Sequence, residues 1–160
     1  MINVRQATER DAEGILEVHV RSVSEICGSH YPPEQIDEWA GSKTAEFFRA
    51  SMAEGEVFVV AEADSRIVGF GVLADAELRA LFVDPQNTGK NIASQILEML
   101  EQMAIEMGLR ELHLKASLNA VEFYRRKGYH GEKPVGHELA SGTKMACIAM
   151  SKVLDSGGVS

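Results

Sequence analysis

The hydrophobic period of the chain first changes near Glu56, and this change constrains the fold more than any other feature. Before it, apolar residues recur every three or four positions, as on the buried face of a helix. After it, short runs of Val, Ile, Leu and Phe follow one another at 57–61, 67–73 and 78–83. A turn at Asp64-Ser65 separates the first two runs. We therefore expect helices first and an antiparallel meander second.

Local signals divide the first third of the chain into one strand and three helices. Residues 2–5 read as a strand, and Thr8 with Asp11 resembles a capping box at the start of a helix that reaches Ile26. Pro33 is suited to open a short second helix, and Thr44 to cap a third. All three helices are expected before the meander begins.

The second half alternates between the two periods. We expect, in chain order, a long helix at 92–107 stopped by Gly108, a strand at 111–116, a helix at 120–127 stopped by Gly128, and strands at 129–137 and 145–153. This order predicts an α/β (α+β) fold with a mixed, mostly antiparallel central sheet and helices on both faces. Residues 1–154 then form a single domain, with 155–160 as a flexible C-terminal tail.

Charge and composition exclude several classes of protein. Sixteen Lys and Arg against twenty-four Asp and Glu give a net charge of −8, which repels nucleic acids and anionic membrane surfaces. The longest apolar run is far too short to span a bilayer, and the N-terminus lacks a signal-peptide core, so we expect a cytoplasmic protein. Cys27 and Cys147 are expected as free thiols, and the five scattered histidines predict no metal site.

The segment 78–94 carries the first chemical signal. It reads as a strand, a proline stop, a polar turn with Gly89 and the opening of a long helix. Free backbone N–H groups at a helix start, with the helix dipole behind them, suit a pyrophosphate, and small residues let it approach. Most junctions of this kind only turn the chain, so the segment does not decide the function alone.

The segment 119–129 carries the second signal, a short helix that places Phe123 and Tyr124 side by side after a strand. One helical step is about 100°, so we expect Phe123 to face the core and Tyr124 to face a cleft. Taken alone, a tyrosine here is more often a packing residue.

Together, the two segments resemble the signature motifs of the GNAT superfamily of acyl-CoA N-acyltransferases, and the resemblance covers residues 2–153. The superfamily usually has Arg or Gln where this chain has Thr88, and Gly where it has Asn91. Both are departures from the pattern of the pyrophosphate turn. The match over 119–129 is the closer of the two.

The resemblance implies that acetyl-CoA binds in a splayed gap between the strands at 78–83 and 111–116. An amine then attacks directly, which makes the expected activity N-acetyl transfer to a primary amine of a small molecule or peptide. Tyr124 takes the role of proton donor to the CoA thiolate. The residues implied in binding acetyl-CoA are Leu81, Phe82, Val83, Thr88, Gly89, Lys90, Asn91, Ile92, Ala93, Ser94, Asn119, Phe123 and Arg126.

The acceptor side is less determined by the sequence. An alkylammonium must lose a proton before it attacks, and Glu77 is the candidate base because it begins the strand that leads to the turn. A solvated carboxylate at the strand edge is an equally good interpretation of Glu77. Cys27, His30, Tyr31 and Trp39 are candidates for the acceptor wall. The amine, the acyl length and the oligomeric state, a homodimer included, stay open, as does a non-catalytic acyl-CoA-binding module on the same fold.

Overall fold

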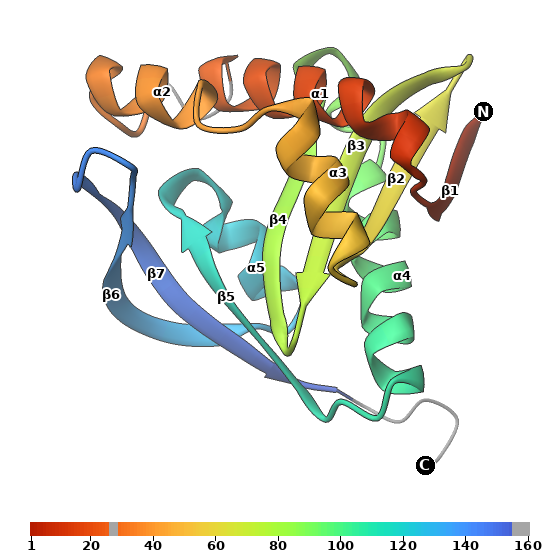
Figure 1. The fold of residues 1–160 in the computed structure, drawn as a ribbon. Helices are drawn as coiled ribbons and strands as arrows, with labels where there is room; N and C mark the ends of the chain where they lie inside the picture. Colours follow the sequence, from red (N-terminus) through yellow and green to blue (C-terminus); the bar gives the residue numbers. More distant parts are fainter. Residues whose placement is uncertain (26–28, 155–160) are drawn as a thin grey trace.

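A computed structural model describes residues 1–25 and 29–154, in which a seven-stranded sheet carries helices on both faces (Figure 1). The cysteine at position 27, the end of the expected first helix and the tail 155–160 lie outside the described residues. The helices and strands are β1 (Ile2–Gln6), α1 (Ala12–Glu25), α2 (Pro33–Ala40), α3 (Ala45–Ala53), β2 (Val57–Ala63), β3 (Arg66–Ala74), β4 (Glu77–Val83), α4 (Ile92–Glu106), β5 (Glu111–Ser117), α5 (Val121–Arg126), β6 (His130–Glu138) and β7 (Lys144–Val153).

The sheet has the strand order β1-β2-β3-β4-β5-β7-β6, and the prediction of a mixed, mostly antiparallel sheet is confirmed. Its single parallel junction lies between β4 and β5, where only two residue pairs form, Glu77 with His113 and Leu78 with Leu114. Beyond these pairs the two strands diverge, as Figure 1 shows. The gap implied between them is therefore present in the fold.

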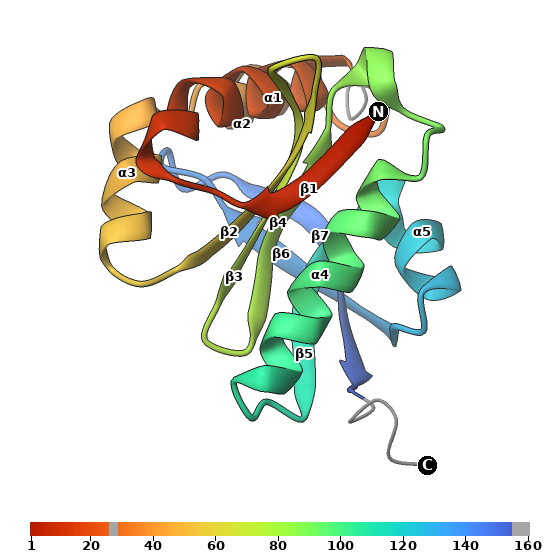
Figure 2. The same cartoon turned by 90° about the vertical axis from the view of Figure 1, so that its right-hand side faces the viewer.

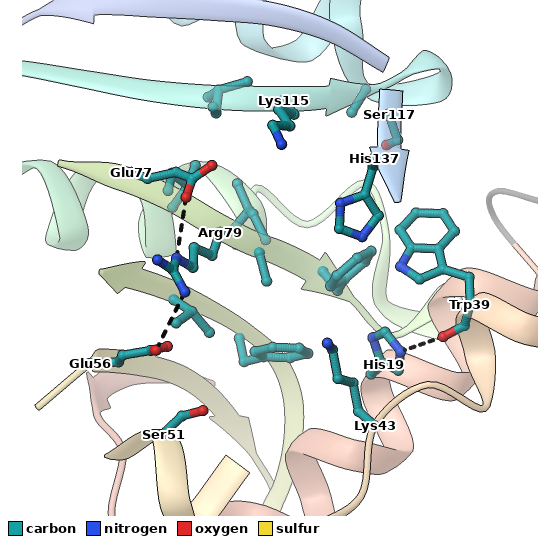
Figure 3. Close-up of a pocket in the computed structure, with 18 of the residues that line it drawn as sticks. His19, Trp39, Lys43, Ser51, Glu56, Glu77, Arg79, Lys115, Ser117 and His137 are labelled. Carbon is teal, nitrogen blue, oxygen red and sulfur yellow. Dashed lines mark hydrogen bonds and ion pairs between the residues drawn. The ribbon is translucent and has the colours of Figure 1, made fainter. Parts of the chain in front are cut away.

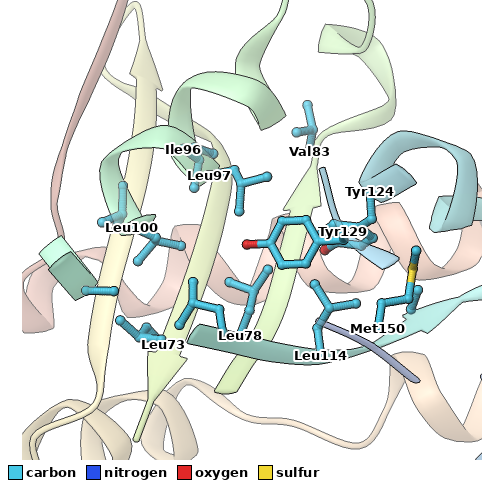
Figure 4. Close-up of a cluster of buried hydrophobic side chains, with 14 of the residues drawn as sticks. Leu73, Leu78, Val83, Ile96, Leu97, Leu100, Leu114, Tyr124, Tyr129 and Met150 are labelled. Carbon is cyan, nitrogen blue, oxygen red and sulfur yellow. The ribbon is translucent and has the colours of Figure 1, made fainter. Parts of the chain in front are cut away.

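The helices form two layers that cover opposite faces of the sheet (Figure 2). On one face, α1 and α3 pack on β2 and β3 around a cluster that contains Ile15, Phe48 and Phe70. On the other face, α4 and α5 pack on the sheet around a larger cluster shown in Figure 4. The short helix α2 joins α1 to the β6–β7 hairpin through a third cluster. The gap between β4 and β5 thus has a helical layer on each side.

Glycines on β3 allow α4 to lie close to the sheet. A Cβ atom at Gly71 would lie 2.7 Å from Leu100 Cδ1 and 2.9 Å from Ile96 Cγ2, closer than packed carbon atoms allow. Gly69 meets the same helix at Ile92 and Ile96. The small residues therefore serve helix–sheet packing, and they fix the position of the N-terminal end of α4 over β3 and β4.

Most local expectations are confirmed. Thr44 Oγ1 accepts a hydrogen bond from Phe47 N at 3.0 Å and caps α3. Gly108 and Gly128 have φ of +88° and +95° after the ends of α4 and α5, where a left-handed residue commonly ends a helix.

The boundaries around α5 differ slightly from the prediction. A short 3-10 turn, Leu118–Ala120, precedes the helix, and β6 begins at His130 instead of Tyr129. The reason is that Tyr129 N donates to Tyr124 O at 3.0 Å, so this residue closes the helix before the strand starts.

Candidate active site

A cavity of about 350 Å³ lies at the divergence of β4 and β5 (Figure 3). Its lining comes from both sides of the sheet. Phe48, Phe70 and Phe82 belong to the packing on the α1–α3 face. Leu114 and Tyr124 belong to the cluster on the α4–α5 face. The cavity therefore connects the two faces through the gap in the sheet.

The main chain of β4 supplies polar groups along one side of the gap. Asp84 N donates to Val68 O at 2.8 Å, which sets the alternation of hydrogen-bonded pairs between β3 and β4. By this alternation, the N–H and C=O groups of Leu81 and Val83 point away from β3 and toward β5. No described strand pairs with β4 there, because the β4–β5 register ends at Leu78. These main-chain groups are available to a ligand.

The side chains of β4 divide between the two faces. Leu81 and Val83 face the α4 side, and Val83 is buried in its cluster. Phe82 faces the α1 side, where its ring lies 5.5 Å from the His19 ring and 5.8 Å from the Trp39 ring. Val83 can thus meet a ligand in the gap only through its main chain, and Phe82 forms part of the opposite wall.

Tyr124 lines the cavity from α5. It is only 7% exposed, and none of the described residues forms a hydrogen bond with its hydroxyl. Burial raises the pKa of Tyr124 well above its ordinary value, so the phenol keeps its proton at neutral pH. As expected, Phe123 packs against the core cluster and Tyr124 faces the cavity, but Phe123 is only half-buried, and its ring lies 5.3 Å from the more deeply buried Tyr124 ring.

The neighbouring tyrosine has a different environment. Tyr129 is fully buried (Figure 4), and its hydroxyl donates to Glu101 Oε2 at 2.8 Å. Lys152 Nζ lies 3.0 Å from Glu101 Oε1, which completes a link between α4 and β7. The hydroxyl of Tyr129 is therefore used in a structural hydrogen bond, whereas the hydroxyl of Tyr124 is free to hydrogen-bond with a ligand in the cavity.

The predicted pyrophosphate turn forms an open approach to the start of α4. Gly89 has φ of +82° with nothing within 4 Å of an added Cβ, and Asn91 has φ of +63° and ψ of +20°. Asn91 is thus left-handed, a conformation in which Asn is enriched among residues with side chains. Thr88, Gly89, Lys90 and Asn91 are exposed. The N–H groups of the first turn of α4 have no partners within the helix, as at any helix start.

Asp84 anchors the base of this turn. Its Oδ1 accepts a hydrogen bond from Gln86 N at 2.9 Å, and its Oδ2 lies 3.0 Å from Arg21 Nη1 of α1. The carboxylate is buried, so this ion pair ties the turn to the helical layer on the other face of the sheet. Ile92 and Ser94, inside the first turn of α4, are buried as well.

Asn119, just before α5, has a side-chain oxygen that lacks a hydrogen-bond donor among the described residues. This atom, Oδ1, is buried. A buried amide oxygen without a partner is costly, and an N–H or O–H group of a ligand would satisfy it. The amide and hydroxyl groups of CoA are donors of this kind, so the residues present fit that ligand. Arg126 is exposed in the last turn of the same helix.

The opposite end of the cavity contains a chain of three charged groups. Glu77 Oε1 lies 3.2 Å from Arg79 Nε, and Arg79 Nη1 lies 3.6 Å from Glu56 Oε2 (Figure 3). Arg79 therefore joins β4 to the residue that precedes β2. The carboxylate of Glu77 lines the cavity and is held there by its ion pair.

Basic groups form the remaining polar wall. Lys43 is half-buried with Nζ 4.3 Å from the centre of the Phe47 ring, and burial lowers its pKa. His19 Nε2 lies 3.1 Å from Trp39 O, and burial lowers the pKa of His19 as well. The pKa of His137 is lowered by desolvation and by the nearby charges of Lys115 and Lys43. Both imidazoles are thus favoured in their neutral form at neutral pH.

Four of the predicted site residues meet at this cavity: Glu77, Leu81, Phe82 and Tyr124. The others lie outside its lining, in β4 (Val83), at the turn and start of α4 (Thr88, Gly89, Lys90, Asn91, Ile92, Ala93 and Ser94) and around α5 (Asn119, Phe123 and Arg126).

Of the expected acceptor wall, only Trp39 lines the cavity among the described residues. Tyr31 is buried beside it, where its hydroxyl donates to Ala146 O at 2.7 Å and accepts from Leu118 N at 2.9 Å. His30 is exposed and contacts Ser29. Cys147 is a free, buried thiol that lines the cavity.

Sequence reasoning missed the polar groups that surround the acceptor end. They are His19, Lys43, Ser51, Glu56, Arg79, Lys115, Ser117 and His137. No motif links them, because they come from separate helices and strands. Among the described residues, no group of His, Cys, Asp and Glu is arranged to hold a metal ion. In the same part of the chain, every helix is too short or too polar to cross a membrane.

Comparisons with known proteins show which family the chain belongs to. Residues 27–147 match the family model of the acetyltransferase (GNAT) domain. The N-acetyltransferase YafP of Escherichia coli is 29% identical over 132 residues, which cover 82% of this chain and 83% of YafP. The spermidine N(1)-acetyltransferase of Thermoplasma acidophilum is 27% identical over 151 residues, covering 86% of this chain and 94% of that protein.

The fold is also shared with solved structures. A GCN5-related N-acetyltransferase from Rhodopseudomonas palustris superimposes with a TM-score of 0.87 at 26% identity, over 95% of each chain. The matched family model covers the diverging strands, the turn before α4 and the helix with Tyr124. The chain belongs to the GNAT acetyltransferase family.

Proposed function

We propose that the protein transfers the acetyl group of acetyl-CoA to a primary amine of a small molecule or peptide. The observation that carries this proposal is the cavity that crosses the sheet at the β4–β5 gap. It joins unpaired main-chain groups and a protonated tyrosine on one side to a polar pocket on the other. Such a passage lets a thioester and an amine meet from opposite faces of the sheet.

Main-chain groups are proposed to bind the donor. The N–H groups from Gly89 to Ser94 suit a pyrophosphate, because the open turn adds no bulk and the N-terminus of α4 carries a positive partial charge. The main chain of Leu81 and Val83 suits the thioester carbonyl and the amide groups of CoA, and Asn119 Oδ1 offers one further acceptor. Acetyl-CoA supplies the activated acyl group at this site.

Tyr124 is the proposed proton donor. When the amine displaces CoA, the sulfur leaves as a thiolate and takes up a proton. The phenol of Tyr124 lines the cavity, is protonated at neutral pH and has no hydrogen-bond partner among the described residues. These properties suit general-acid catalysis toward the leaving sulfur.

Glu77 is the proposed acceptor of the proton from the amine, either directly or through water. An alkylammonium with a pKa near 10 is only about one part in a thousand neutral at pH 7, so a base is needed. The ion pair with Arg79 holds the carboxylate against the cavity. His137 is the second candidate, because its lowered pKa favours a neutral imidazole that can accept a proton.

The test is an assay of CoA thiol release from acetyl-CoA across a panel of primary amines, with mass spectrometry of the products. Alkylamines, polyamines, amino acids and lysine peptides cover the amine classes, and the spermidine enzyme among the relatives makes spermidine one member. We expect at least one amine to gain 42 Da, the mass that one acetyl group adds in place of a hydrogen. We also expect about one CoA thiol to be released per molecule of product. Binding of CoA without thiol release from any amine would instead support a non-catalytic acyl-CoA-binding module.

A further inference from the structure

The charge of the cavity differs in sign from the charge of the whole chain. The chain carries a net charge of −8, but the cavity is lined by three cations, Lys43, Arg79 and Lys115, and two carboxylates, Glu56 and Glu77. A pocket built only to attract a cationic amine would have the opposite balance. The basic side chains therefore need a separate explanation.

Arg79 is already compensated within the protein. It contacts Glu77 at 3.2 Å and Glu56 at 3.6 Å, so these three side chains form one acidic wall with a bridging guanidinium. The other two cations are Lys43 and Lys115; the charge of Glu56 acts on Lys43, but from beyond ion-pair distance. In the described part of the chain, neither ammonium group has a carboxylate within 4.0 Å.

Lys43 is the more informative of the two lysines because it is half-buried. Its nearest described partner is the face of the Phe47 ring, 4.3 Å from Nζ. Placing an ammonium group in a partly desolvated pocket without a direct ion pair costs free energy: burial lowers the pKa of Lys43, and the more distant charge of Glu56 offsets this only in part. An anion bound in the pocket would offset this cost.

The basic groups lie together on one side of the cavity. Figure 3 shows Lys43, from the segment before α3, and Lys115, from β5, pointing into the cavity with His137 between them, and the Glu77–Arg79–Glu56 chain at the left of the view. The charges of Lys115 and Lys43 lower the pKa of His137 and the charge of Glu77 raises it, so all three side chains lie near this imidazole. The acidic wall (Glu77, Arg79 and Glu56) and the basic wall (Lys43, Lys115 and His137) therefore face the same cavity, which Trp39 and Phe82 also line.

We propose, on the basis of the function proposed above, that the acceptor is an amphoteric molecule that carries both the reacting amine and a carboxylate. Its amine lies toward Glu77 and Glu56, and its carboxylate lies between Lys43 and Lys115. The aromatic walls contact the apolar body that joins the two groups. A carboxylate fits better than a phosphate, because the basic wall offers two point charges without the guanidinium fork or helix N-terminus that commonly binds phosphate.

The experiment uses pairs of amines that differ by one carboxylate. A series of ω-amino acids is compared with alkylamines of equal carbon number, and L-phenylalanine is compared with 2-phenylethylamine. We expect kcat/KM to be about tenfold or more higher for the carboxylated member of the best pair, the size of one charge-assisted contact. Spermidine and phosphoethanolamine complete the panel.

Charge variants then connect the preference to the basic wall. Lys43→Gln should reduce the preference for the carboxylated amine about tenfold, mainly through KM, with little change for its uncharged partner. Lys115→Gln is a second variant at the same wall, should Lys43→Gln fail to fold. Lys133→Gln removes an exposed lysine outside the cavity and should leave the preference unchanged.

The outcomes separate this inference from the proposed function. Acetylation of no amine would contradict the function itself. Equal rates within every pair, or a preference for spermidine, would overturn the amphoteric acceptor while leaving N-acetyl transfer intact. A preference for phosphoethanolamine over every carboxylated amine would overturn the assignment of the anion as a carboxylate. Unchanged preference in both lysine variants would remove the basic wall from acceptor binding.

Discussion

The two faces of the sheet offer different chemistry to a ligand. On the α4–α5 face, the available groups belong mostly to the main chain: the free edge of β4, the turn at Gly89 and the first turn of α4. On the α1–α3 face, they belong to side chains of α1, β4, β5 and β6 and of the residues just before α3 and β2. Main-chain recognition tolerates changes of side chain, and side-chain recognition does not.

Asn91 illustrates this tolerance. The superfamily pattern that the chain resembles usually has glycine at this position, and the structure gives Asn91 a left-handed backbone. Because Asn adopts that conformation at little cost, the turn keeps its shape although the residue differs. A substitution of Lys43 or Glu77 by an uncharged residue would instead remove a charge from the cavity.

The largest expected effect separates the two neighbouring tyrosines. Tyr124→Phe should lower kcat by about 10²- to 10⁴-fold with acetyl-CoA binding nearly intact, because only the proton donor is lost. Tyr129→Phe should leave kcat nearly intact but lower the free energy of unfolding by about 1–3 kcal/mol, because Glu101 loses a buried hydrogen bond. Steady-state kinetics and denaturant unfolding measure the two effects. Full turnover by Tyr124→Phe would return that residue to a packing role.

The next effect concerns the acidic wall. Glu77→Gln should lower kcat about 100-fold at pH 7 and recover part of the loss near pH 9–10, where the amine loses its proton unaided. Glu56→Gln removes the other carboxylate partner of Arg79 and should raise KM without changing the shape of the pH profile.

His137 gives the contrasting outcome for the same measurement. The pKa of His137 lies below the ordinary value of 6.5, so its imidazole is neutral around pH 7. A rate that depends on neutral His137 is therefore independent of pH near 7, and it falls only when the pH drops toward the lowered pKa. Two results together would identify His137 as the base. The fall in rate at acidic pH would be absent in His137→Gln, and Glu77→Gln would keep the wild-type dependence of the rate on pH.

The smallest expected effect tests the main-chain face. Saturating CoA should raise the Tm of the wild-type protein, and Gly89→Glu should abolish the shift, because a carboxylate at the open turn repels the pyrophosphate. Gly142→Glu is the matched control: Gly142 has φ of +91° against +82° for Gly89, and neither has an atom within 4 Å of an added Cβ. The control should lose some stability but keep the CoA shift. An unchanged shift in folded Gly89→Glu would contradict the assigned position of the pyrophosphate.

The sequence predicts the fold well because most boundaries have a local cause. The period changes at Glu56, Thr44 caps α3, and glycines end α4 and α5. The start of β6 could not be placed exactly, because it depends on a hydrogen bond from Tyr129 to the preceding helix. Local signals therefore describe the elements, and contacts between residues adjust their ends.

The sequence predicts only one part of the candidate site, the part formed by continuous segments. The turn before α4 and the helix with Tyr124 are continuous segments, so their patterns can be read directly. The acceptor end unites His19, Lys43 and His137, which lie on separate elements and share no spacing. Their proximity follows from the strand order and from the packing of α1 and α2 against the sheet and the β6–β7 hairpin, which no local pattern encodes.

The early end of the β4–β5 pairing also determines which molecules can reach the unpaired part of β4. An unpaired strand edge at the perimeter of a sheet invites pairing with another chain, and proteins commonly protect such edges. Here the unpaired part of β4 lies inside the sheet, between helical layers on both faces (Figure 2). A neighbouring protein cannot easily reach it, but a slender ligand with amide groups can. The fold thus excludes other chains from an edge that it leaves open to small molecules.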